Sequence, residues 1–372
     1  MSEREFDLFF AGPPGLEHVL AAEARELGFA GAQAQPGGVG ARGGWPEIWR
    51  ANLWLRGANR VLMRVAEFRA PHLAVLDKRA RRVDWAAVLR PDRPVQVEAV
   101  CRASKIYHQK AAATRVADAI AASLGTPVSD REGLRVMVRI EDDLCTISLD
   151  TSGEPLHRRG LKQAVGKAPL REGLAALFLR HLAFNGSEPV ADPMCGSGTF
   201  PIEAAEIAVG HAPGRMRSFA FEELAGFDPS VWQAMRASNP AAAERTEFHA
   251  YGADRDQGAI LNATANAARA GLADLTSFRR APISDFTPPD GPRGLVMVNP
   301  PYGARIGNKK LLYALYGTLG RVLAERFAGW RIGLVTSEPG MARATGLPFQ
   351  GDRLTTQHGG LTVGLYATKA LP

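Results

Sequence analysis

The chain has 372 residues, a length typical of two or three domains. Apolar residues make up 46% and charged residues 22%, a balance that excludes a wholly disordered protein. The three cysteines form no CxxC pattern and the eight histidines form no HxxxH pair, so we expect neither a disulfide framework nor a metal site. No apolar run reaches about 18 residues and no secretory signal is visible, so a cytoplasmic protein without membrane contact is expected.

Positive charge is concentrated in one segment. The chain carries 45 Lys and Arg against 38 Asp and Glu, a net charge of +7. Residues 51–115 hold 14 of the basic and 5 of the acidic side chains, which gives +9 there and leaves −2 for the rest. Such a segment attracts polyanions and favours a nucleic acid partner, although an arginine-rich surface without function would give the same count.

The first 50 residues predict half of a small α+β unit. An apolar run at 6–10 predicts a strand, and apolar residues at helical spacing predict a helix over 16–27, capped by Gly28. Residues 36–44 are rich in glycine and predict a loop. We assign residues 1–50 to an N-terminal segment.

Residues 51–155 predict a second α+β block. The apolar segment 54–65 carries Arg56, Arg60 and Arg64, which a helix would place on one face. The remaining pattern predicts a strand, a helix and two paired strands, at 95–100, 110–124, 134–140 and 144–149.

From residue 156 to residue 372 the pattern changes to alternating strands and helices, which is typical of a mostly parallel sheet. A helix is predicted between Pro169 and His181. Two strands around Gly359-Gly360 predict a closing hairpin, so the sheet should end in an antiparallel strand. The expected fold class is α/β, preceded by an α+β region.

The sequence DPMCGSGT at 192–199 joins a short predicted strand to a helix. Gly196 and Gly198 would let backbone N–H groups approach a ligand closely at the helix N-terminus. The dinucleotide fingerprint needs a glycine where Pro201 stands, and the Walker pattern needs a lysine that is absent. Asp192 would repel a phosphate but suits an amine, so the turn matches an amino acid zwitterion such as the methionine half of S-adenosylmethionine.

A second motif, Asn299-Pro300-Pro301-Tyr302, follows another predicted strand. Proline has no N–H, and its carbonyl stays available as an acceptor. The Asn299 oxygen and the Pro300 carbonyl make two acceptors for one NH2 group, while Tyr302 offers a flat face to a base. The motif indicates an exocyclic base amine placed to attack a methyl group, with a simple proline turn as the alternative for the motif alone.

Together with Leu156-His157-Arg158-Arg159-Gly160, these motifs resemble the THUMP-domain class I RNA methyltransferases. Within them the chain is most similar to the bacterial enzymes that modify N2 of a guanosine in 23S ribosomal RNA. Matches at 15–17, 51–56 and 107–110 carry the N-terminal part. The resemblance implies a ferredoxin-like segment over 1–50, a THUMP RNA-binding domain over 51–155 and a Rossmann-like methyltransferase domain over 156–372.

The resemblance also assigns the cofactor, S-adenosylmethionine, to residues. The methionine half would lie against Asp192, Pro193, Met194, Gly196, Gly198 and Thr199. The ribose hydroxyls would bind Asp254, beside Arg255. The family has an acid for the adenine amine where this chain has Pro282, so Ile283 or Asp285 would replace it. Residues 210–248 resemble an insertion that relatives share.

By the same resemblance, Asn299, Pro300 and Tyr302 are the implied catalytic residues. Cys195 lies inside the glycine turn without a histidine neighbour in sequence, so it is expected to be a packing residue. RNA contacts are expected from Arg102, Lys105, Lys110, Arg158 and Arg159, although the last two equally suit a solvated linker. The leading hypothesis is methylation of a guanosine N2 amine in 23S rRNA. The same chemistry on tRNA, adenine-N6 methylation of DNA and a non-catalytic RNA-binding assembly factor stay open as alternatives.

Overall fold

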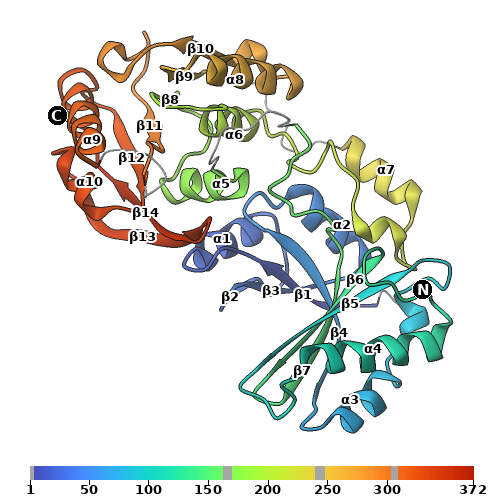
Figure 1. Ribbon diagram of the computed structural model, residues 1–372. Helices are drawn as coiled ribbons and strands as arrows, with labels where there is room; N and C mark the ends of the chain where they lie inside the picture. The colour runs from blue at the N-terminus through green and yellow to red at the C-terminus, as the bar shows by residue number, and fades with distance from the viewer. Residues whose placement is uncertain (1–3, 162–169, 239–247, 303–308) are drawn as a thin grey trace. The chain divides into compact units, whose positions relative to one another are not determined.

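The structure, a computed structural model, describes residues 4–161, 170–238, 248–302 and 309–372, without the side chain of Asp352. The chain divides into two compact units that alternate along the sequence (Figure 1). The N-terminal unit comprises Met1–Gly12, Ala21–Leu156 and Arg217–Ser238. The C-terminal unit comprises Pro13–Leu20, His157–Met216 and Asn239–Pro372.

The N-terminal unit is built on one sheet with the strand order β2-β3-β1-β4-β7-β6-β5. All neighbouring pairs are antiparallel except β5 and β6. The pairing of β1 with β4, from Asp7 opposite Arg64 to Ala11 opposite Arg60, makes the sheet continuous across residue 50. The strands are β1 (Phe6–Ala11), β2 (Gln33–Gln35), β3 (Gly38–Gly43), β4 (Arg60–Arg69), β5 (Val95–Arg102), β6 (Leu134–Glu141) and β7 (Leu144–Asp150).

Helix α2 of the N-terminal unit is covered by a distant part of the chain. Trp49 of α2 contacts the rings of Phe221 and Phe227 at centroid distances of 6.2 and 5.9 Å. A Cβ on Gly226 would lie 1.9 Å from the Trp45 ring, so only glycine fits there. Residues 217–238 of the predicted insertion therefore pack in this unit, while 239–247 lie outside the described residues. The helices are α2 (Trp45–Trp54), α3 (Leu73–Ala80), α4 (Gln109–Leu124) and α7 (Pro229–Ala237), with short 3-10 turns η1 (Trp85–Ala87) and η2 (Ala220–Glu223), while α1 (Glu17–Glu26) begins in the C-terminal unit and ends in this one.

Two local predictions for this unit are wrong. The expected helix over 54–65 is replaced by the end of α2 at Trp54 and by strand β4 from Arg60. An even spacing such as Arg60 to Arg64 also places side chains on one face of a strand, so it could not separate the two structures. The expected loop at 36–44 contains β3, where a Cβ on Gly38 would lie 2.2 Å from the Phe10 carbonyl oxygen. Glycine there permits close strand pairing.

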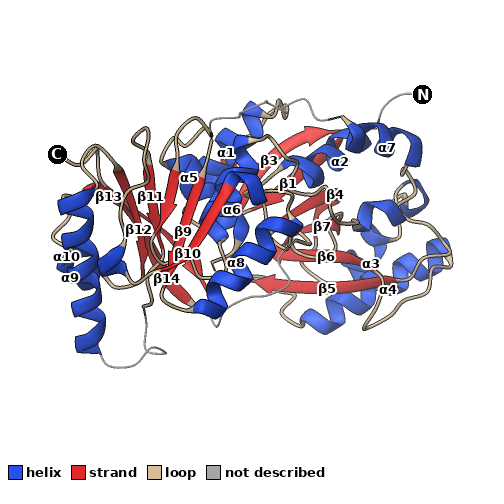
Figure 2. Cartoon of the chain, turned by 90° about the horizontal axis from the view of Figure 1, so that it is seen from above, coloured by secondary structure: helices blue, strands red, loops and turns tan. Residues whose placement is uncertain are grey.

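The C-terminal unit contains the predicted α/β fold. Its sheet has the order β10-β9-β8-β11-β12-β14-β13 (Figure 2). The pairs from β10 to β12 are parallel, and β14 is antiparallel to both of its neighbours, which confirms the predicted antiparallel last strand. The strands are β8 (Val190–Asp192), β9 (Ala250–Asp254), β10 (Thr276–Arg280), β11 (Leu295–Val298), β12 (Arg331–Thr336), β13 (Gln350–His358) and β14 (Leu361–Ala367).

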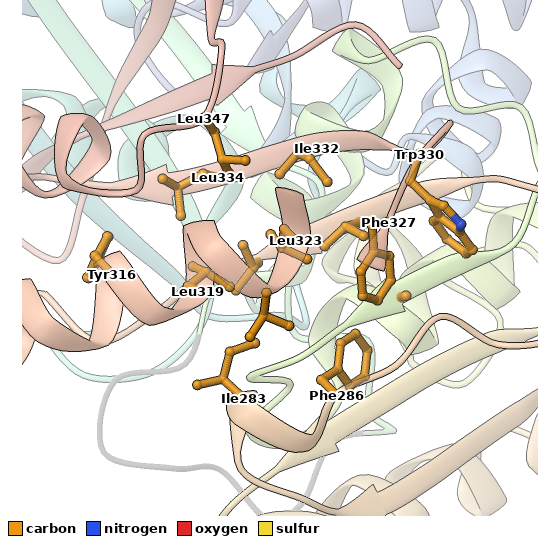
Figure 3. Packing of buried hydrophobic residues seen from close by; sticks show 14 of the residues in the cluster. Ile283, Phe286, Tyr316, Leu319, Leu323, Phe327, Trp330, Ile332, Leu334 and Leu347 are labelled. Atoms are coloured by element: carbon orange, nitrogen blue, oxygen red, sulfur yellow. The ribbon is translucent and has the colours of Figure 1, made fainter. Parts of the chain in front are cut away.

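Helices cover both faces of this sheet. Helices α5, α6 and α8 lie on one face, and α9 and α10 lie on the other (Figures 1 and 2). Beneath α9, the buried rings of Phe286 and Phe327 stack at 5.4 Å, and Trp330 meets Phe327 edge-on (Figure 3). The elements are α5 (Glu172–His181), α6 (Thr199–Ala208), α8 (Gln257–Arg269), η3 (Ala273–Leu275), η4 (Ile283–Asp285), α9 (Lys309–Arg326) and α10 (Pro339–Ala344). Within the described ranges, no helix is both long and apolar enough to span a membrane.

Helices α9 and α10 approach closely at Gly320. A Cβ there would lie 1.7 Å from the Thr345 carbonyl oxygen. We expect Gly320→Ala to lower the free energy of unfolding by about 1–3 kcal/mol, because the two segments must separate. Urea denaturation of the full chain measures this change. Gly317→Ala on the same helix is the control, because its Cβ would meet nothing closer than the Ala344 carbonyl oxygen at 3.7 Å. That variant should gain up to about 1 kcal/mol of helix propensity, and equal losses in both would contradict the close approach.

Candidate active site

Three polar side chains meet at the carboxyl edge of the parallel strands. Strand β8 pairs with β9 through Asp192 opposite Gly252, and with β11 through Ala191 opposite Val296. Asp192 ends β8 and Asp254 ends β9, while Asn299 directly follows β11. Ligands of open α/β sheets bind outside this edge. The fold therefore brings together the two predicted motifs and Asp254.

The glycine turn after β8 is held by hydrogen bonds to β9. Cys195 N donates to the Ala253 carbonyl at 2.9 Å, and Gly196 N donates to Asp254 Oδ2 at 3.0 Å. Met194 N donates to Asp192 Oδ1 at 3.0 Å, which closes the turn on its own strand. Asp254 Oδ1 also accepts from Asp256 N at 2.9 Å, so Asp254 supports the turn, and each of its two oxygens keeps a second lone pair that could accept from a further donor.

The two glycines of the turn have different structural roles. Both have positive φ, +53° at Gly196 and +85° at Gly198, where a side chain is strained. A Cβ on Gly198 would lie 3.0 to 3.3 Å from Ile202, Ala263 and Phe278, so its missing side chain allows α6 to pack on α8 and β10. A Cβ on Gly196 would meet nothing within 4 Å. Gly196 therefore borders open space, as a ligand contact requires.

Burial disfavours the charged form of the acid in this turn. Asp192 is 2% exposed, and burial raises the pKa of its carboxyl well above the usual range, with nearby Asp254 raising it further. A cation placed beside Asp192 would oppose both effects and stabilise the carboxylate. The pKa of the Cys195 thiol is raised by burial and by the same two carboxyls. A neutral, buried thiol agrees with the packing role expected for Cys195.

Among the described residues, the Asn299 side chain has an acceptor without a hydrogen-bond donor. Asn299 Oδ1 is buried, and none of the described residues donates a hydrogen bond to it. A buried acceptor left unpaired costs free energy of about 1–3 kcal/mol, so a ligand N–H that bonded to Asn299 Oδ1 would be stabilised there. Tyr302 is partly covered here, and burial raises the pKa of its phenol to about 12. At neutral pH Tyr302 therefore offers an uncharged ring.

The buried hydroxyls of Tyr316 and Thr336 support the Asn-Pro-Pro-Tyr loop through hydrogen bonds. The Tyr316 hydroxyl lies 3.4 Å from the Pro301 carbonyl oxygen and 3.1 Å from Thr336 Oγ1. Thr336 Oγ1 in turn accepts from Glu338 N at 3.2 Å. Each hydroxyl has one hydrogen, so all three bonds form together when Tyr316 donates to Pro301 and Thr336 donates to Tyr316. Sequence reasoning missed both residues, because a tyrosine among apolar residues of a helix predicts core.

The residues expected to bind ribose and adenine lie at the ends of β9 and β10. Ala281 N donates to the Asp254 carbonyl at 2.9 Å, which places the start of η4 beside β9. Ile283 is buried, whereas Asp285 and Arg255 are exposed. The adenine contact by Ile283 or Asp285 stays a prediction.

The predicted RNA contacts differ in exposure. Arg102, Lys105 and Lys110 lie at the end of β5, in the following loop and in the first turn of α4, and all three are exposed. Arg158 is also exposed. Arg159 is 6% exposed and forms an ion pair with buried Glu203 at 3.4 Å, so its guanidinium belongs to an internal pair rather than to an RNA surface. Across the described ranges, no group of three or more His, Cys, Asp or Glu side chains is placed to hold a metal ion.

Comparison with known proteins decides the family. Residues 159–356, more than half of the chain, match the family model described as the RMKL-like methyltransferase domain. The chain belongs to this methyltransferase family. Residues 7–62 match the RlmL ferredoxin-like domain. Both matches confirm the predicted resemblance and the predicted fold class.

Solved structures of similar proteins agree over the whole chain. One, described as a methyltransferase complexed with S-adenosylhomocysteine, is 28% identical, with 100% of each chain covered and a TM-score of 0.90. Another, described as a predicted N6-adenine-specific DNA methylase from Listeria monocytogenes, is 30% identical, with 99% of this chain and 97% of that chain covered and a TM-score of 0.90. TrmN from Thermus thermophilus is 22% identical over 99% of this chain and 100% of that chain, with a TM-score of 0.75, and shares the fold.

The Tyr316 hydroxyl should affect catalysis by this methyltransferase through the loop it holds. We expect Tyr316→Phe to lower kcat for methyl transfer about fivefold, because one hydrogen bond of about 1 kcal/mol no longer fixes the acceptors. Thr336→Val should lower kcat similarly, and Thr336→Ser should retain it. Steady-state kinetics measure kcat and the KM for the donor, which should stay unchanged.

The matched control is Tyr313→Phe, an exposed tyrosine one turn earlier on α9. Its activity should equal that of the wild type. An unaltered kcat in Tyr316→Phe, or an equal loss in Tyr313→Phe, would contradict the role of the buried hydroxyls.

Proposed function

We propose that the protein transfers a methyl group from S-adenosylmethionine to the exocyclic N2 amine of a guanosine in 23S rRNA. The observation that carries this proposal is the buried Asn299 Oδ1, to which no described residue donates, at the same sheet edge as the glycine turn. An acceptor of this kind suits an NH2 group, and the turn beside it suits a methyl donor.

The glycine turn fits S-adenosylmethionine in shape and charge. Gly196 leaves open space, and Asp192 favours a neighbouring cation, as both the amino group and the sulfonium of this donor are. The prediction of this cofactor is supported by the relative crystallised with its demethylated product. When bound, the donor supplies a methyl group already activated by the sulfonium.

The residues of the chain would then hold and polarise the base amine. Asn299 Oδ1 and the Pro300 carbonyl would accept its two N–H groups, turning the nitrogen lone pair toward the methyl group. The same two oxygens would stabilise the positive charge that develops on the nitrogen. Tyr302 would stack on the base through its neutral ring. Fixed alignment of this kind can contribute about 7–11 kcal/mol to catalysis.

RNA as the substrate is supported by the N-terminal unit. Its exposed Arg102, Lys105 and Lys110 would contact phosphates, which position a nucleic acid without reading its sequence. A guanosine within a helix would have to be extruded into the site, at a cost of a few kcal/mol. The match to the RlmL ferredoxin-like domain is consistent with this class of substrate.

Two alternatives keep the chemistry and change the substrate. One is the same methylation on tRNA. The other is adenine-N6 methylation of DNA, favoured by the description of the relative from Listeria monocytogenes. Mass spectrometry of nucleic acids from a deletion strain separates the three substrates. The strain would lose N2-methylguanosine from 23S rRNA, N2-methylguanosine from tRNA or N6-methyladenine from DNA, according to which one the protein methylates. Loss of N2-methylguanosine from tRNA alone would remove the rRNA proposal, and loss of N6-methyladenine from DNA would remove RNA altogether.

Removal of the Asn299 acceptor should slow catalysis strongly without loss of cofactor binding. We expect Asn299→Ala to lower kcat by a factor of about 100–1000, the usual effect of losing one preorganised transition-state contact. Transfer of labelled methyl to deproteinised rRNA measures this change. Calorimetry with S-adenosylhomocysteine is the control and should give the wild-type affinity. Methyl transfer at the wild-type rate would contradict the catalytic role of Asn299, whereas no transfer by the wild type itself would support the non-catalytic assembly factor.

A side chain at Gly196 should block the cofactor. We expect Gly196→Ala to weaken S-adenosylhomocysteine binding at least about tenfold by calorimetry, because the Cβ enters the open space. Gly271→Ala is the matched control, with φ at +72° and no atom within 4 Å of its Cβ, at the end of α8. Backbone strain should destabilise both variants alike, so equal affinities would show that Gly196 borders no ligand.

A further inference from the structure

A second hollow lies apart from the glycine turn, where α10 meets β13 and β14. Its volume is about 510 Å3. Arg343 of α10 and Arg353 of β13 line it together with His181 at the end of α5. Phe349 and Tyr366 contribute two rings whose centroids are 5.7 Å apart. We refer to this hollow as the α10–β13 pocket.

The two arginines of the α10–β13 pocket are available to an anion. Both are exposed, and no carboxylate among the described side chains forms an ion pair with either of them. Arg353 Nη1 donates to the Tyr366 hydroxyl at 3.2 Å, which fixes the direction of its guanidinium over the pocket wall. A guanidinium with free donors is suited to a phosphate, which it can contact through two parallel N–H groups.

The backbone explains why a hollow forms here. The register of β13 against β14 shifts between Gln350 and Leu354, so the strand bulges over the residues between them. Gly351 has φ at +72°, which permits that bulge. The bulge lifts this stretch off the ladder and carries Arg353 to the pocket wall. The pocket therefore results from the bulge in β13 at the edge of the sheet.

The pocket also connects to the candidate active site through the sheet. Helix α10 begins at Pro339, which lines the pocket and lies three residues after the end of β12. Strand β12 is the direct neighbour of β11, with Val298 opposite Leu334. Asn299 follows Val298 immediately. The strands that line the pocket, β14 and β13, follow β12 in the sheet order. A polymer with one base at Asn299 would thus have to extend across β12 to reach the pocket.

We propose that the α10–β13 pocket is a second RNA subsite, which takes a phosphodiester group and its nucleotide. Arg343 and Arg353 would bind the phosphate, while the rings of Phe349 and Tyr366 would pack on the sugar or base. This inference rests on the proposed function, since it assumes an RNA substrate. It adds an RNA contact within the methyltransferase domain to those expected in the N-terminal unit.

Single substitutions of the two arginines test the subsite in the full chain. We expect Arg343→Ala and Arg353→Ala each to raise the Kd for deproteinised 23S rRNA about tenfold, and to reduce the slope of log Kd against log salt concentration by about 1. Filter binding over a salt series measures both. At saturating RNA, kcat and the affinity for S-adenosylhomocysteine should equal those of the wild type.

The control is Arg321→Ala, which removes an exposed arginine of α9 that pairs with Glu325 outside the pocket. It should leave both the Kd and the salt slope near the wild-type values. If Arg343→Ala and Arg353→Ala behave like this control while the wild type binds and methylates RNA, the subsite is wrong and the proposed function stands. If the wild type neither binds nor methylates RNA, the proposed function is wrong, and the subsite, which rests on it, is wrong as well. A fall in kcat at unchanged Kd would also overturn the subsite.

Discussion

The pairing of β8 between β9 and β11 is the constraint on which the candidate active site depends. Strand β8 has only three residues, yet it is hydrogen-bonded in parallel on both sides. Its position alone brings Asp192 next to Asp254, 62 residues further along the chain, and next to Asn299, 107 residues further. Because carboxyl ends of parallel strands share one edge, three loops that are distant in sequence become one surface.

Both loops of the site are fixed from the protein side. The glycine turn donates its N–H groups to Ala253 and Asp254, and the Asn-Pro-Pro-Tyr loop receives the Tyr316 hydroxyl through Pro301. These bonds order the loops before any substrate arrives, so less conformational entropy is lost on binding. Among the described residues, Asn299 Oδ1 has no donor and a Cβ on Gly196 has no neighbour within 4 Å, and these are the places where the proposed ligands would bind.

Local signals in the sequence predicted most of the C-terminal unit and both of its motifs. A glycine turn between a strand and a helix, an Asn-Pro-Pro run after a strand and a Gly-Gly turn between two strands are each recognisable within about ten residues. Contacts between distant residues were not accessible. Arg159 pairs with Glu203, which lies 44 residues away in the sequence. No residue near Arg159 in the sequence indicates that its guanidinium is in an internal ion pair and not on an RNA-binding surface. The hydrogen bonds of Tyr316 and Thr336 could not be predicted for the same reason, because a hydroxyl in an apolar sequence pattern does not indicate its acceptor.

The N-terminal unit shows a different limit. Arg60 and Arg64 recur at a spacing that suits one face of a helix and one face of a strand equally, and β4 exists because β1 and β7 pair with it on both sides. Glycines that predict a loop at 36–44 instead allow β3 to lie close to β1. Sheet pairing overrides local preference in both places.

The aromatic cover of α2 has a consequence for synthesis of the chain. The polypeptide passes between the two units five times, after residues 12, 20, 156, 216 and 238. A nascent chain that has left the ribosome only as far as residue 156 holds every strand of its first sheet but not Phe221 or Phe227. Trp49 then stays uncovered until translation has run through the glycine turn of the other sheet. The N-terminal unit therefore holds all of its residues only once residue 238 has been made, when strands β9 to β14 of the other sheet have still to be synthesised.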